Sequence, residues 1–416
     1  MCYRSCIQVK KGFLSEYFDG VVAKRLSGVE ANSDQSNQHE FNGVNPLKQL
    51  LGHERLTDCP TKFIWLGEEN EGVSEDSSVT WYDSRENHPT RSEFRLYFKS
   101  NPVMKLASTD DLLIVAKRPS GEIMIIVVSS GSTVENQLLW LFSVPFQIDT
   151  DFEYRNFNND ENTEVDFASR FILDELGIEI EEPEADRLDS LLERFNGVFP
   201  KTAVFSDFVR GTLPDVSPLD GPDIALLSWM EQEEKLFRRM ERHIVSERLV
   251  SGFMSDDGAD VDGFIKFSLS VQNRRKSRAG YAFENHLEEI FKTCGVTYDS
   301  QAVTENKSKP DFLFPGAIEY HNTDFPHSKL AMLGVKSTCK DRWRQVLSEA
   351  ARIPEKHLIT LEPGISENQT REMEAHKLQL ILPRGLHGTY RESQQKWLLD
   401  LEGFIALVKE REAISY

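Results

Sequence analysis

The chain has 416 residues, which is enough for two or three domains, and its composition, 39% hydrophobic and 28% charged, is typical of a globular protein. No stretch is apolar enough to predict a membrane span, and residues 1–13 lack the apolar core of a signal peptide. The five cysteines are scattered without CxxC pairs, so they indicate neither a disulfide framework nor a zinc site, and we expect reduced thiols in a cytoplasmic protein.

The formal net charge of −20 is unfavourable for a protein that binds duplex DNA, because DNA is itself a polyanion. The excess is concentrated between Asp149 and Glu193, where sixteen acidic and three basic residues give a local net charge of −13. Local charge in a cleft, rather than the total, decides whether DNA is attracted. Both ends of the chain therefore remain candidates for nucleic-acid binding.

Residues 1 to about 145 are predicted to form an all-β unit with one or two helices. Two apolar runs, 112–116 and 123–128, flank a polar stretch and predict a hairpin. Further short strands are expected at 63–66, 79–82 and 94–98, and many short strands with polar turns favour a barrel. Residues 134–142 are compatible with a closing helix or a strand.

Two polar stretches in this unit carry arginines and amides, the side chains that reach guanine and adenine edges. The first begins at Lys24 and Arg25 and continues through a polar loop that contains His39. The second runs from Tyr82 to Arg95. Taken without other information, both stretches are better interpreted as solvated turns.

Residues 149–193 are predicted to be an acidic linker. Phe167, Phe171 and Leu173 recur at helical spacing, so we expect a flexible part near 156–162 followed by a helix. A solvated linker is a simpler interpretation than a DNA mimic that shields a basic cleft. Residues 195–272 are predicted to be helical, with a long charged amphipathic segment over 224–249.

A basic cluster comes next, immediately before a predicted helix. The cluster consists of Arg274, Arg275, Lys276 and Arg278. The helix has an apolar stripe formed by Phe283, Leu287, Ile290 and Phe291. Arginines at the start of a helix oppose the helix dipole, so we predict that the cluster contacts phosphates or bases. His286, within the helix, is expected to be structural.

The C-terminal part places an acid, a lysine and a second acid near two short strands and a helix. Asp311 opens the apolar run 312–314, and Lys336 ends the apolar run 331–335. From residue 340 onward the apolar positions adopt helical spacing, and Glu349 is predicted to lie on that helix. Strands at 357–361 and 377–382, a helix over 366–376 and a closing helix over about 390–410 complete an α/β core.

Two carboxylates and an amine suit a magnesium site. Mg²⁺ prefers oxygen ligands and usually takes one or two carboxylates plus waters and phosphate oxygens. Such an ion polarises a phosphate and lowers the pKa of a bound water, which a neighbouring lysine can orient. This is the constellation of the PD-(D/E)XK nucleases, except that the position two before Lys336 is Gly334 instead of an acid. Glu349 is the candidate for the missing carboxylate.

The order of these motifs resembles the EcoRII branch of the type II restriction endonucleases. Three runs carry the resemblance, 273–280, 309–315 and 339–345. It is dense over about 265–408 and thinner over the N-terminal third. The resemblance implies a two-domain protein: an N-terminal pseudobarrel with flanking helices, like the plant B-three DNA-binding domain, at 1–148, and a PD-(D/E)XK nuclease domain at 194–416, with its core at about 273–410.

The resemblance also implies roles for the C-terminal residues. Asp311 and Glu349 would hold Mg²⁺, and Lys336 would position the attacking water. Glu284 stands where such nucleases carry an additional acid on their first helix. DNA recognition would fall to the triplet Lys340, Asp341 and Arg342, beside the basic cluster. Arginine pairs with guanine and aspartate accepts from cytosine, so the triplet suits a C:G pair.

In the N-terminal domain, the two polar stretches correspond to the arms with which the B-three-like domain grips the major groove. The residues expected to contact DNA there are Lys24, Arg25, His39, Arg85, Arg91, Glu93 and Arg95. Pro89 and Phe94 stand at positions that are basic in the family's arm, which affects the affinity or the target of this chain.

The function implied is that of a type II site-specific deoxyribonuclease acting on double-stranded DNA at a CC/GG-flanked pseudopalindrome such as CCWGG. The family forms a homodimer through the catalytic domain, and its N-terminal domain binds extra target copies and covers the catalytic cleft when DNA is absent. Two alternatives stay open: a repair or methylation-dependent nuclease with the same core, and a non-catalytic DNA-binding regulator. No membrane partner is expected.

Overall fold

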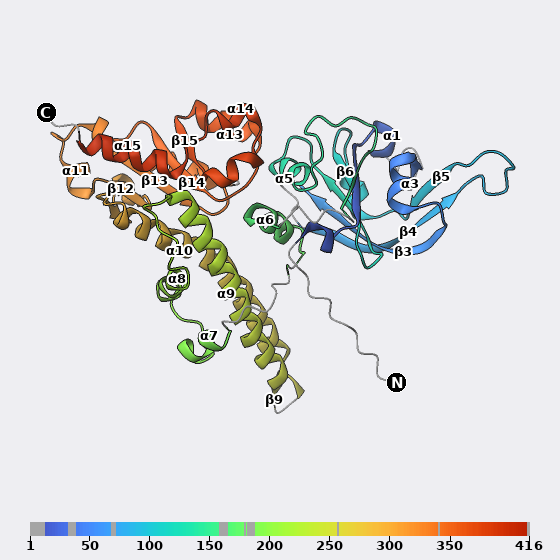
Figure 1. Ribbon diagram of the computed structural model, residues 1–416, viewed down its shortest axis with the longest axis horizontal. Helices are drawn as coiled ribbons and strands as arrows, with labels where there is room; N and C mark the ends of the chain where they lie inside the picture. Colours follow the sequence, from blue (N-terminus) through green and yellow to red (C-terminus); the bar gives the residue numbers. More distant parts are fainter. Residues whose placement is uncertain are drawn as a thin grey trace. The chain divides into compact units, whose positions relative to one another are not determined.

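The computed structural model describes residues 13–31, 39–67, 72–157, 165–178, 180, 188–255, 258–339 and 342–413. The chain divides into two compact units, residues 1–183 with 363–368 and residues 184–362 with 369–416. Each unit is built around its own sheet (Figure 1). None of the helices in the described ranges is long and apolar enough to cross a membrane.

The first unit contains an eight-stranded sheet in the order β2-β5-β4-β3-β7-β6-β1-β8. Its strands are β1 Gly20–Arg25, β2 Glu40–Gly43, β3 Leu56–Leu66, β4 Val73–Asp83, β5 Phe94–Phe98, β6 Leu112–Lys117, β7 Ile123–Val128 and β8 Glu153–Asn156. Neighbouring strands are antiparallel except β3 and β7, which are parallel. Every strand that the sequence predicted in this unit is confirmed.

The central strands β1, β6 and β7 are buried on both sides of this sheet. Alternate residues of β7 enter two separate cores, Ile126 on one side and Ile125 on the other. The helices α5 (Thr133–Leu141) and α6 (Phe167–Glu175) line the first core, and α3 (Asn45–Leu51) and α4 (Pro102–Leu106) line the second. Burial on both sides explains why β7 is a continuous apolar run. Full burial of each such side chain stabilises the folded state by about 1.5–3 kcal/mol.

Part of the expected acidic linker belongs to the first unit. Strand β8 pairs antiparallel with β1, from Gly20 opposite Asn156 to Ala23 opposite Glu153. The predicted helix after it is α6, which buries Ile172 and Leu173 in the first core. The predicted boundary at residue 148 is therefore too early, and most of the stretch 156–162 lies outside the described residues.

The second unit begins with the helices α7 (Leu188–Phe195), α8 (Thr202–Gly211), α9 (Pro222–Ser251) and α10 (Val261–Thr293). The long helices α9 and α10 lie side by side, joined by a short hairpin of β9 (Met254–Ser255) and β10 (Gly258–Ala259) (Figure 1). The helical prediction for 195–272 is confirmed. The basic cluster, however, lies within α10 and not at a helix start, so the dipole argument for it was wrong.

A five-stranded mixed sheet forms the core of the second unit. In spatial order its strands are β11 (Asp299–Ser300), β12 (Phe312–Phe314), β13 (Ala331–Lys336), β14 (Lys356–Thr360) and β15 (Leu378–Ile381). The two pairs from β11 to β13 are antiparallel, and the two from β13 to β15 are parallel. This order brings the start of β12 beside the end of β13.

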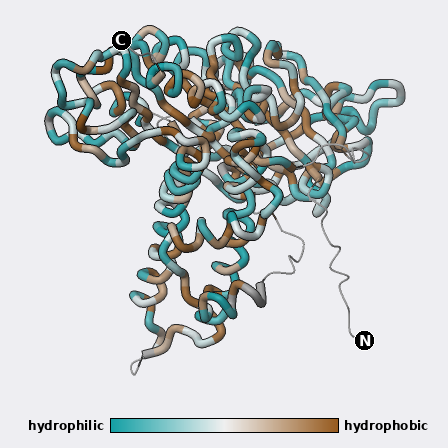
Figure 2. The backbone as a smooth tube through the Cα atoms, turned by 60° about the vertical axis from the view of Figure 1, so that its left-hand side comes forward, coloured by the Kyte–Doolittle hydropathy of each residue, from teal (hydrophilic) through white to brown (hydrophobic). Residues whose placement is uncertain are grey.

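Aromatic packing fixes α10 and the last helix to this sheet. The predicted α10 stripe is fully buried, and the ring centre of Phe291 lies 5.1 Å from that of Phe312 and 5.3 Å from that of Phe314. Phe404, on α15 (Leu401–Ala413), lies 5.5 Å from Phe314. In Figure 2 the hydrophobic segments gather inside each unit, and most loops are hydrophilic.

Two predicted helices of the second unit are shorter than expected. The closing helix is divided into α14 (Glu392–Gln395) and α15, because Asp400 starts a new helix by accepting a hydrogen bond from the Gly403 N–H. The helix expected from residue 340 is a single turn, α12 (Trp343–Val346). Ala350 has a φ of +48°, which a continuing helix does not allow, so Glu349 lies in a turn instead of on a helix.

Candidate active site

The sheet pairing brings Asp311 and Lys336 together, as the sequence predicted. In the antiparallel pair β12–β13, Phe312 is opposite Leu333, so Asp311 lies beside the last residues of β13. Its Oδ2 accepts hydrogen bonds from the Val335 N–H at 2.6 Å and from the Lys336 Nζ at 3.1 Å. Both side chains are only 13% exposed. A mostly buried ion pair therefore forms at the end of the sheet where β12 begins and β13 ends.

Glu349 reaches the same place from the turn that follows α12. The pKa of Glu349 is raised to about 7, mainly by burial and also by the negative charge of Asp311, against the opposing charges of Lys336 and Lys356. Its Oε2 is buried and accepts no hydrogen bond from the described residues. A buried carboxylate oxygen without a donor costs free energy, which a cation at this position would offset.

Glu284 approaches from α10, also as predicted. The pKa of Glu284 is raised to about 7, mainly by burial and also by the charges of Asp311 and Glu288, against the opposing charge of Lys336. Asp311 and Lys336 thus act electrostatically on both glutamates. Perturbed pKa values produced by burial and a specific charged partner are typical of functional sites.

These residues fit a divalent cation. A bound cation would favour the ionised forms of the two glutamates and would give the Glu349 Oε2 the partner that it lacks. Within the described ranges, no three or more His, Cys, Asp and Glu side chains already form a metal cage. One or two carboxylates suit a hard divalent cation, which would complete its shell with water and phosphate oxygens.

The packing of α12 on β13 explains why no acid precedes Lys336. A Cβ atom on Gly334 would lie 2.8 Å from Cγ2 and 3.1 Å from Cγ1 of Val346, which is fully buried on α12. A side chain at residue 334 therefore requires α12 to move. The carboxylate is supplied instead from the turn at the end of the same short helix.

Several residues that the sequence did not single out hold the site. The buried Lys356 Nζ donates to the Ile353 carbonyl at 2.8 Å and to the Ala350 carbonyl at 3.4 Å, and Glu305 accepts the Ala351 N–H at 3.1 Å. These contacts fix the turn that carries Glu349. The sequence did not indicate them, because the Lys356 contacts depend on the turn that they close and Glu305 lies 46 residues from Ala351.

Gln301 was also missed. Its Nε2 donates to the Asp311 Oδ1 at 3.1 Å, and its backbone N–H donates to the Asp311 carbonyl oxygen at 3.1 Å. The first contact occupies the carboxylate oxygen that Val335 and Lys336 do not hold. Its only signal in the sequence is that it follows the strand that pairs with β12.

The basic cluster of α10 is largely engaged in helix packing, contrary to the predicted DNA contacts. Arg278 is 7% exposed, pairs with Glu234 and lies 3.3 Å from Glu233, both on α9. Arg275 pairs with Glu241 of α9 at 2.6 Å. The guanidinium of Arg274 lies 4.4 Å from the ring centre of Phe199. The contact role predicted for Arg278 is corrected, because its side chain is buried against acids of α9. The side chain of Arg275 is 40% exposed, so its DNA contact stays a prediction. The side chain of Lys276 lies outside the description.

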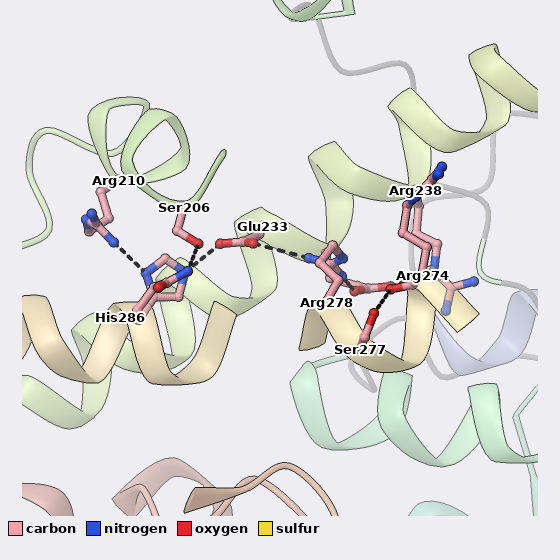
Figure 3. A network of polar contacts seen from close by, with 10 residues as sticks. Ser206, Arg210, Glu233, Arg238, Arg274, Ser277, Arg278 and His286 are labelled. Atoms are coloured by element: carbon pink, nitrogen blue, oxygen red, sulfur yellow. Dashed lines mark hydrogen bonds and ion pairs between the residues drawn. The ribbon is translucent and has the colours of Figure 1, made fainter. Parts of the chain in front are cut away.

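A buried polar network continues from this cluster, as Figure 3 shows. Glu233 is fully buried and joins Arg278 to His286, whose Nε2 lies 2.8 Å from the Glu233 Oε2. Arg210 lies 3.3 Å from the His286 Nδ1 and can only donate, so Nδ1 accepts and Nε2 carries the proton. Burial lowers the pKa of His286, which agrees with a neutral ring. The expectation that His286 is structural fits this geometry.

The predicted recognition triplet is only partly visible. Lys340 and Asp341 lie outside the described residues. Arg342 is exposed at the start of α12, and its backbone N–H donates to the Cys339 carbonyl at 2.7 Å.

The first polar stretch of the N-terminal unit is tied into the fold. Lys24 is 6% exposed, pairs with Glu30 at 2.8 Å and lies 4.9 Å from the ring centre of Phe152. Arg25 pairs with Glu135 and donates to the Asp110 carbonyl at 3.1 Å. The DNA contacts predicted for Lys24 and Arg25 are corrected, because Glu30, six residues from Lys24, and Glu135, 110 residues from Arg25, neutralise the two charges.

The second polar stretch is more accessible. Glu93 pairs with Arg85 at 2.6 Å and with Arg95, and these arginines, Arg95 first, hold the pKa of Glu93 below its usual value. Arg91 is exposed. His39 is partly exposed, with its ring centre 6.0 Å from that of Phe98. Of the two polar stretches, only the stretch 82–95 therefore has basic side chains that are accessible to DNA in the structure as described.

Comparison with known proteins locates a clear similarity in the second unit. The family model described as EcoRII C terminal matches residues 237–405. The chain is 46% identical over 186 residues to the type II restriction enzyme EcoRII of Escherichia coli, covering 44% of this chain and 45% of that enzyme. It is 29% identical over 110 residues to the type II restriction enzyme SsoII of Shigella sonnei, covering 24% of this chain and 35% of that enzyme. The matches thus span less than half of each relative.

Solved structures show a weaker likeness. Metal-depleted Ecl18kI in complex with uncleaved, modified DNA has a TM-score of 0.44 at 19% identity, covering 55% of this chain and 85% of that one. The complex of restriction endonuclease PspGI with substrate DNA has a TM-score of 0.43 at 16% identity, covering 51% and 93%. The family match is the stronger finding. Residues 237–405, which hold Glu284, Asp311, Lys336 and Glu349, match the EcoRII C-terminal family model and are similar in sequence to type II restriction enzymes.

Proposed function

We propose that the chain is a type II site-specific deoxyribonuclease that hydrolyses phosphodiester bonds of double-stranded DNA with Mg²⁺. One observation carries the proposal: in the domain homologous to restriction enzymes, Asp311 and Lys336 are in contact, and Glu284 and Glu349 interact electrostatically with both. That grouping is the chemistry that metal-assisted phosphodiester hydrolysis needs.

Each residue has a distinct role in this proposal. Asp311 and Glu349 hold the ion, which supplies Lewis-acid polarisation of the phosphate and a more acidic water. Lys336, anchored by Asp311, orients the attacking water and offsets negative charge on the phosphate. Glu284, with its pKa near 7, orients Lys336 or holds a second ion. The products are a 5′-phosphate and a 3′-hydroxyl.

The proposed target is a CC/GG-flanked pseudopalindrome such as CCWGG. Lys340, Asp341 and Arg342 would read it from the major groove. Arg342 is exposed at the start of α12, and Glu349 follows the end of that helix, so reader and catalytic acid belong to one short segment. A bidentate arginine–guanine pair contributes about 1–3 kcal/mol of discrimination.

The first unit is proposed to be a B-three-like pseudobarrel that binds further copies of the target and inhibits cleavage when DNA is absent. The eight-stranded sheet and the arginines of stretch 82–95 support this assignment. Exposed ion pairs contribute only about 0–1 kcal/mol, so a DNA phosphate can replace Glu93 as the partner of Arg85 or Arg95. Arg91 supplies a further accessible charge.

A homodimer through the catalytic unit is proposed on the basis of an exposed apolar surface. The surface lies where α9 and α10 meet the β9–β10 hairpin and consists of Leu249, Val250, Met254, Val261, Phe264, Ile265 and Leu269, which are 46–87% exposed. Contiguous apolar surface of this kind marks interaction sites. Two copies would read the two halves of a pseudopalindrome.

Digestion of a randomised plasmid library with Mg²⁺, followed by sequencing of the ends, tests the proposal. The expected result is a single defined cut sequence that is absent with Lys336→Ala. Random ends, cleavage restricted to methylated DNA, or no cleavage by the wild-type chain would each contradict it.

A further inference from the structure

Gln301 lies directly opposite the candidate catalytic aspartate. Strand β11 pairs with β12 so that Ser300 is opposite Phe312, and the next residue along, Gln301, therefore comes beside Asp311. Two hydrogen bonds join the residues, one from the Gln301 backbone N–H to the Asp311 carbonyl and one from Nε2 to Oδ1, both at 3.1 Å. The amide thus has a fixed position relative to the carboxylate.

The backbone of Gln301 is in the left-handed region, with a φ of +54°. Glycine adopts this region freely, and asparagine and aspartate adopt it more readily than glutamine does. The turn alone would therefore favour glycine or asparagine. Unfavourable backbone geometry that persists next to a functional group is a reason to look for a role of the side chain.

The hydrogen bonds around Asp311 divide its two oxygens between different partners. Oδ2 is held by the Val335 N–H and the Lys336 Nζ, whereas Oδ1 is held by the neutral amide of Gln301. Carboxylates that bind metal are oriented by such outer hydrogen bonds, and loss of one typically costs about 10–100-fold in metal affinity or activity. Each carboxylate oxygen has two lone pairs, so Oδ1 keeps one for another partner.

We propose that Gln301 is a positioning residue for Asp311: its amide holds Oδ1 so that the carboxylate presents its free lone pair to the divalent cation. This inference rests on the proposed function, because it takes Asp311 as a ligand of that cation. Asparagine suits this backbone conformation better, but its side chain is one methylene shorter, so its amide would not reach the Asp311 Oδ1. The position therefore requires the length of glutamine.

The test compares Gln301→Asn and Gln301→Gly with wild type in the full chain. Stabilisation by Ca²⁺ is followed as the rise of the melting temperature with ion concentration, which needs no catalysis. Cleavage is followed as a function of Mg²⁺ concentration, with KM for DNA measured at saturating Mg²⁺. Lys377→Gly is the matched control: Lys377 has a φ of +56° and an exposed side chain, and its backbone carbonyl, which accepts the Lys356 N–H at 3.1 Å, is kept in glycine.

Both Gln301 variants should fold with unchanged or higher melting temperature without metal, as should the control. Only the Gln301 variants should need about 10–100-fold more Ca²⁺ or Mg²⁺ for half-maximal effect, with KM for DNA unchanged within about twofold. Unchanged metal dependence would overturn the inference. A higher KM at unchanged metal dependence would also overturn it, by assigning the amide to DNA. If the wild-type chain binds Ca²⁺ but does not cleave DNA, the proposed function fails while the Ca²⁺ titration still decides the role of Gln301.

Discussion

Substitution of Gly334 by alanine tests why this site takes its second acid from Glu349. The new Cβ would lie 2.8 Å from Cγ2 of Val346, closer than van der Waals contact allows. Overpacking of this kind costs about 1–3 kcal/mol. Inside a strand, alanine is otherwise favoured over glycine by about 0.5–1 kcal/mol, so a loss of stability would show directly that the contact exists.

A double-mutant cycle with Val346→Ala isolates the contact. Val346 is fully buried, so Val346→Ala alone should cost about 2 kcal/mol, from two methyl groups at roughly 0.8 kcal/mol each plus a small cavity. In the double variant the alanine at residue 334 occupies space that the valine vacated. The double variant should therefore be more stable than additivity predicts by about 1–3 kcal/mol.

Urea unfolding of the four proteins measures this coupling, and DNA cleavage measures its consequence. Because α12 leads into the turn that carries Glu349, displacement of Val346 should lower cleavage by Gly334→Ala, and Val346→Ala should partly restore it. Strictly additive free energies, or a Gly334→Ala variant as stable as wild type, would refute this packing explanation.

Three further predictions concern the two glutamates of the site, the buried Arg278 and the first unit. The pKa values of Glu284 and Glu349 are raised to about 7, so in metal-free protein both protonated groups stabilise the fold, and this stabilisation is lost as the pH rises from about 4.5 to 7. The double variant Glu284→Gln, Glu349→Gln should therefore show a flatter dependence of the free energy of unfolding on pH between pH 5 and 8. An unchanged dependence would contradict the shifted pKa values. Arg278→Ala should lower stability by about 3–5 kcal/mol because it leaves the buried Glu233 of α9 without its arginine, without changing the salt dependence of DNA binding; a shallower salt dependence would restore its predicted role as a phosphate contact. Removal of residues 1–183 should raise cleavage of DNA that carries a single site, and unchanged activity would contradict inhibition by the first unit.

The sequence predicted the parts of the site that depend on strand ends. Asp311 and Lys336 stand at the ends of apolar runs, and strands that end at one edge of a sheet bring such residues together. Glu349 was also predicted to lie near both, but on a helix. It lies in a turn instead, because the backbone of Ala350 is left-handed and Lys356 and Glu305 hold the turn in place.

The errors have a common physical origin in partners that lie far away in the sequence. Arg25 looked available for DNA because nothing nearby neutralises it, yet its acid is Glu135 on a different element. Arg278 was assigned to DNA for the same reason and pairs with α9. Strand β8 was hidden within an acidic segment because pairing with β1 requires only its backbone.

The location of a bound ion tests the central claim most directly. A crystal of the protein with uncleaved target DNA and Mn²⁺ in place of Mg²⁺ would show the ion by anomalous scattering. We expect a peak about 2–2.2 Å from an oxygen of Asp311 and from an oxygen of Glu349. A peak coordinated by Asp311 without Glu349, or an ion bound elsewhere, would contradict the assignment of Glu349 as the second acid of the site.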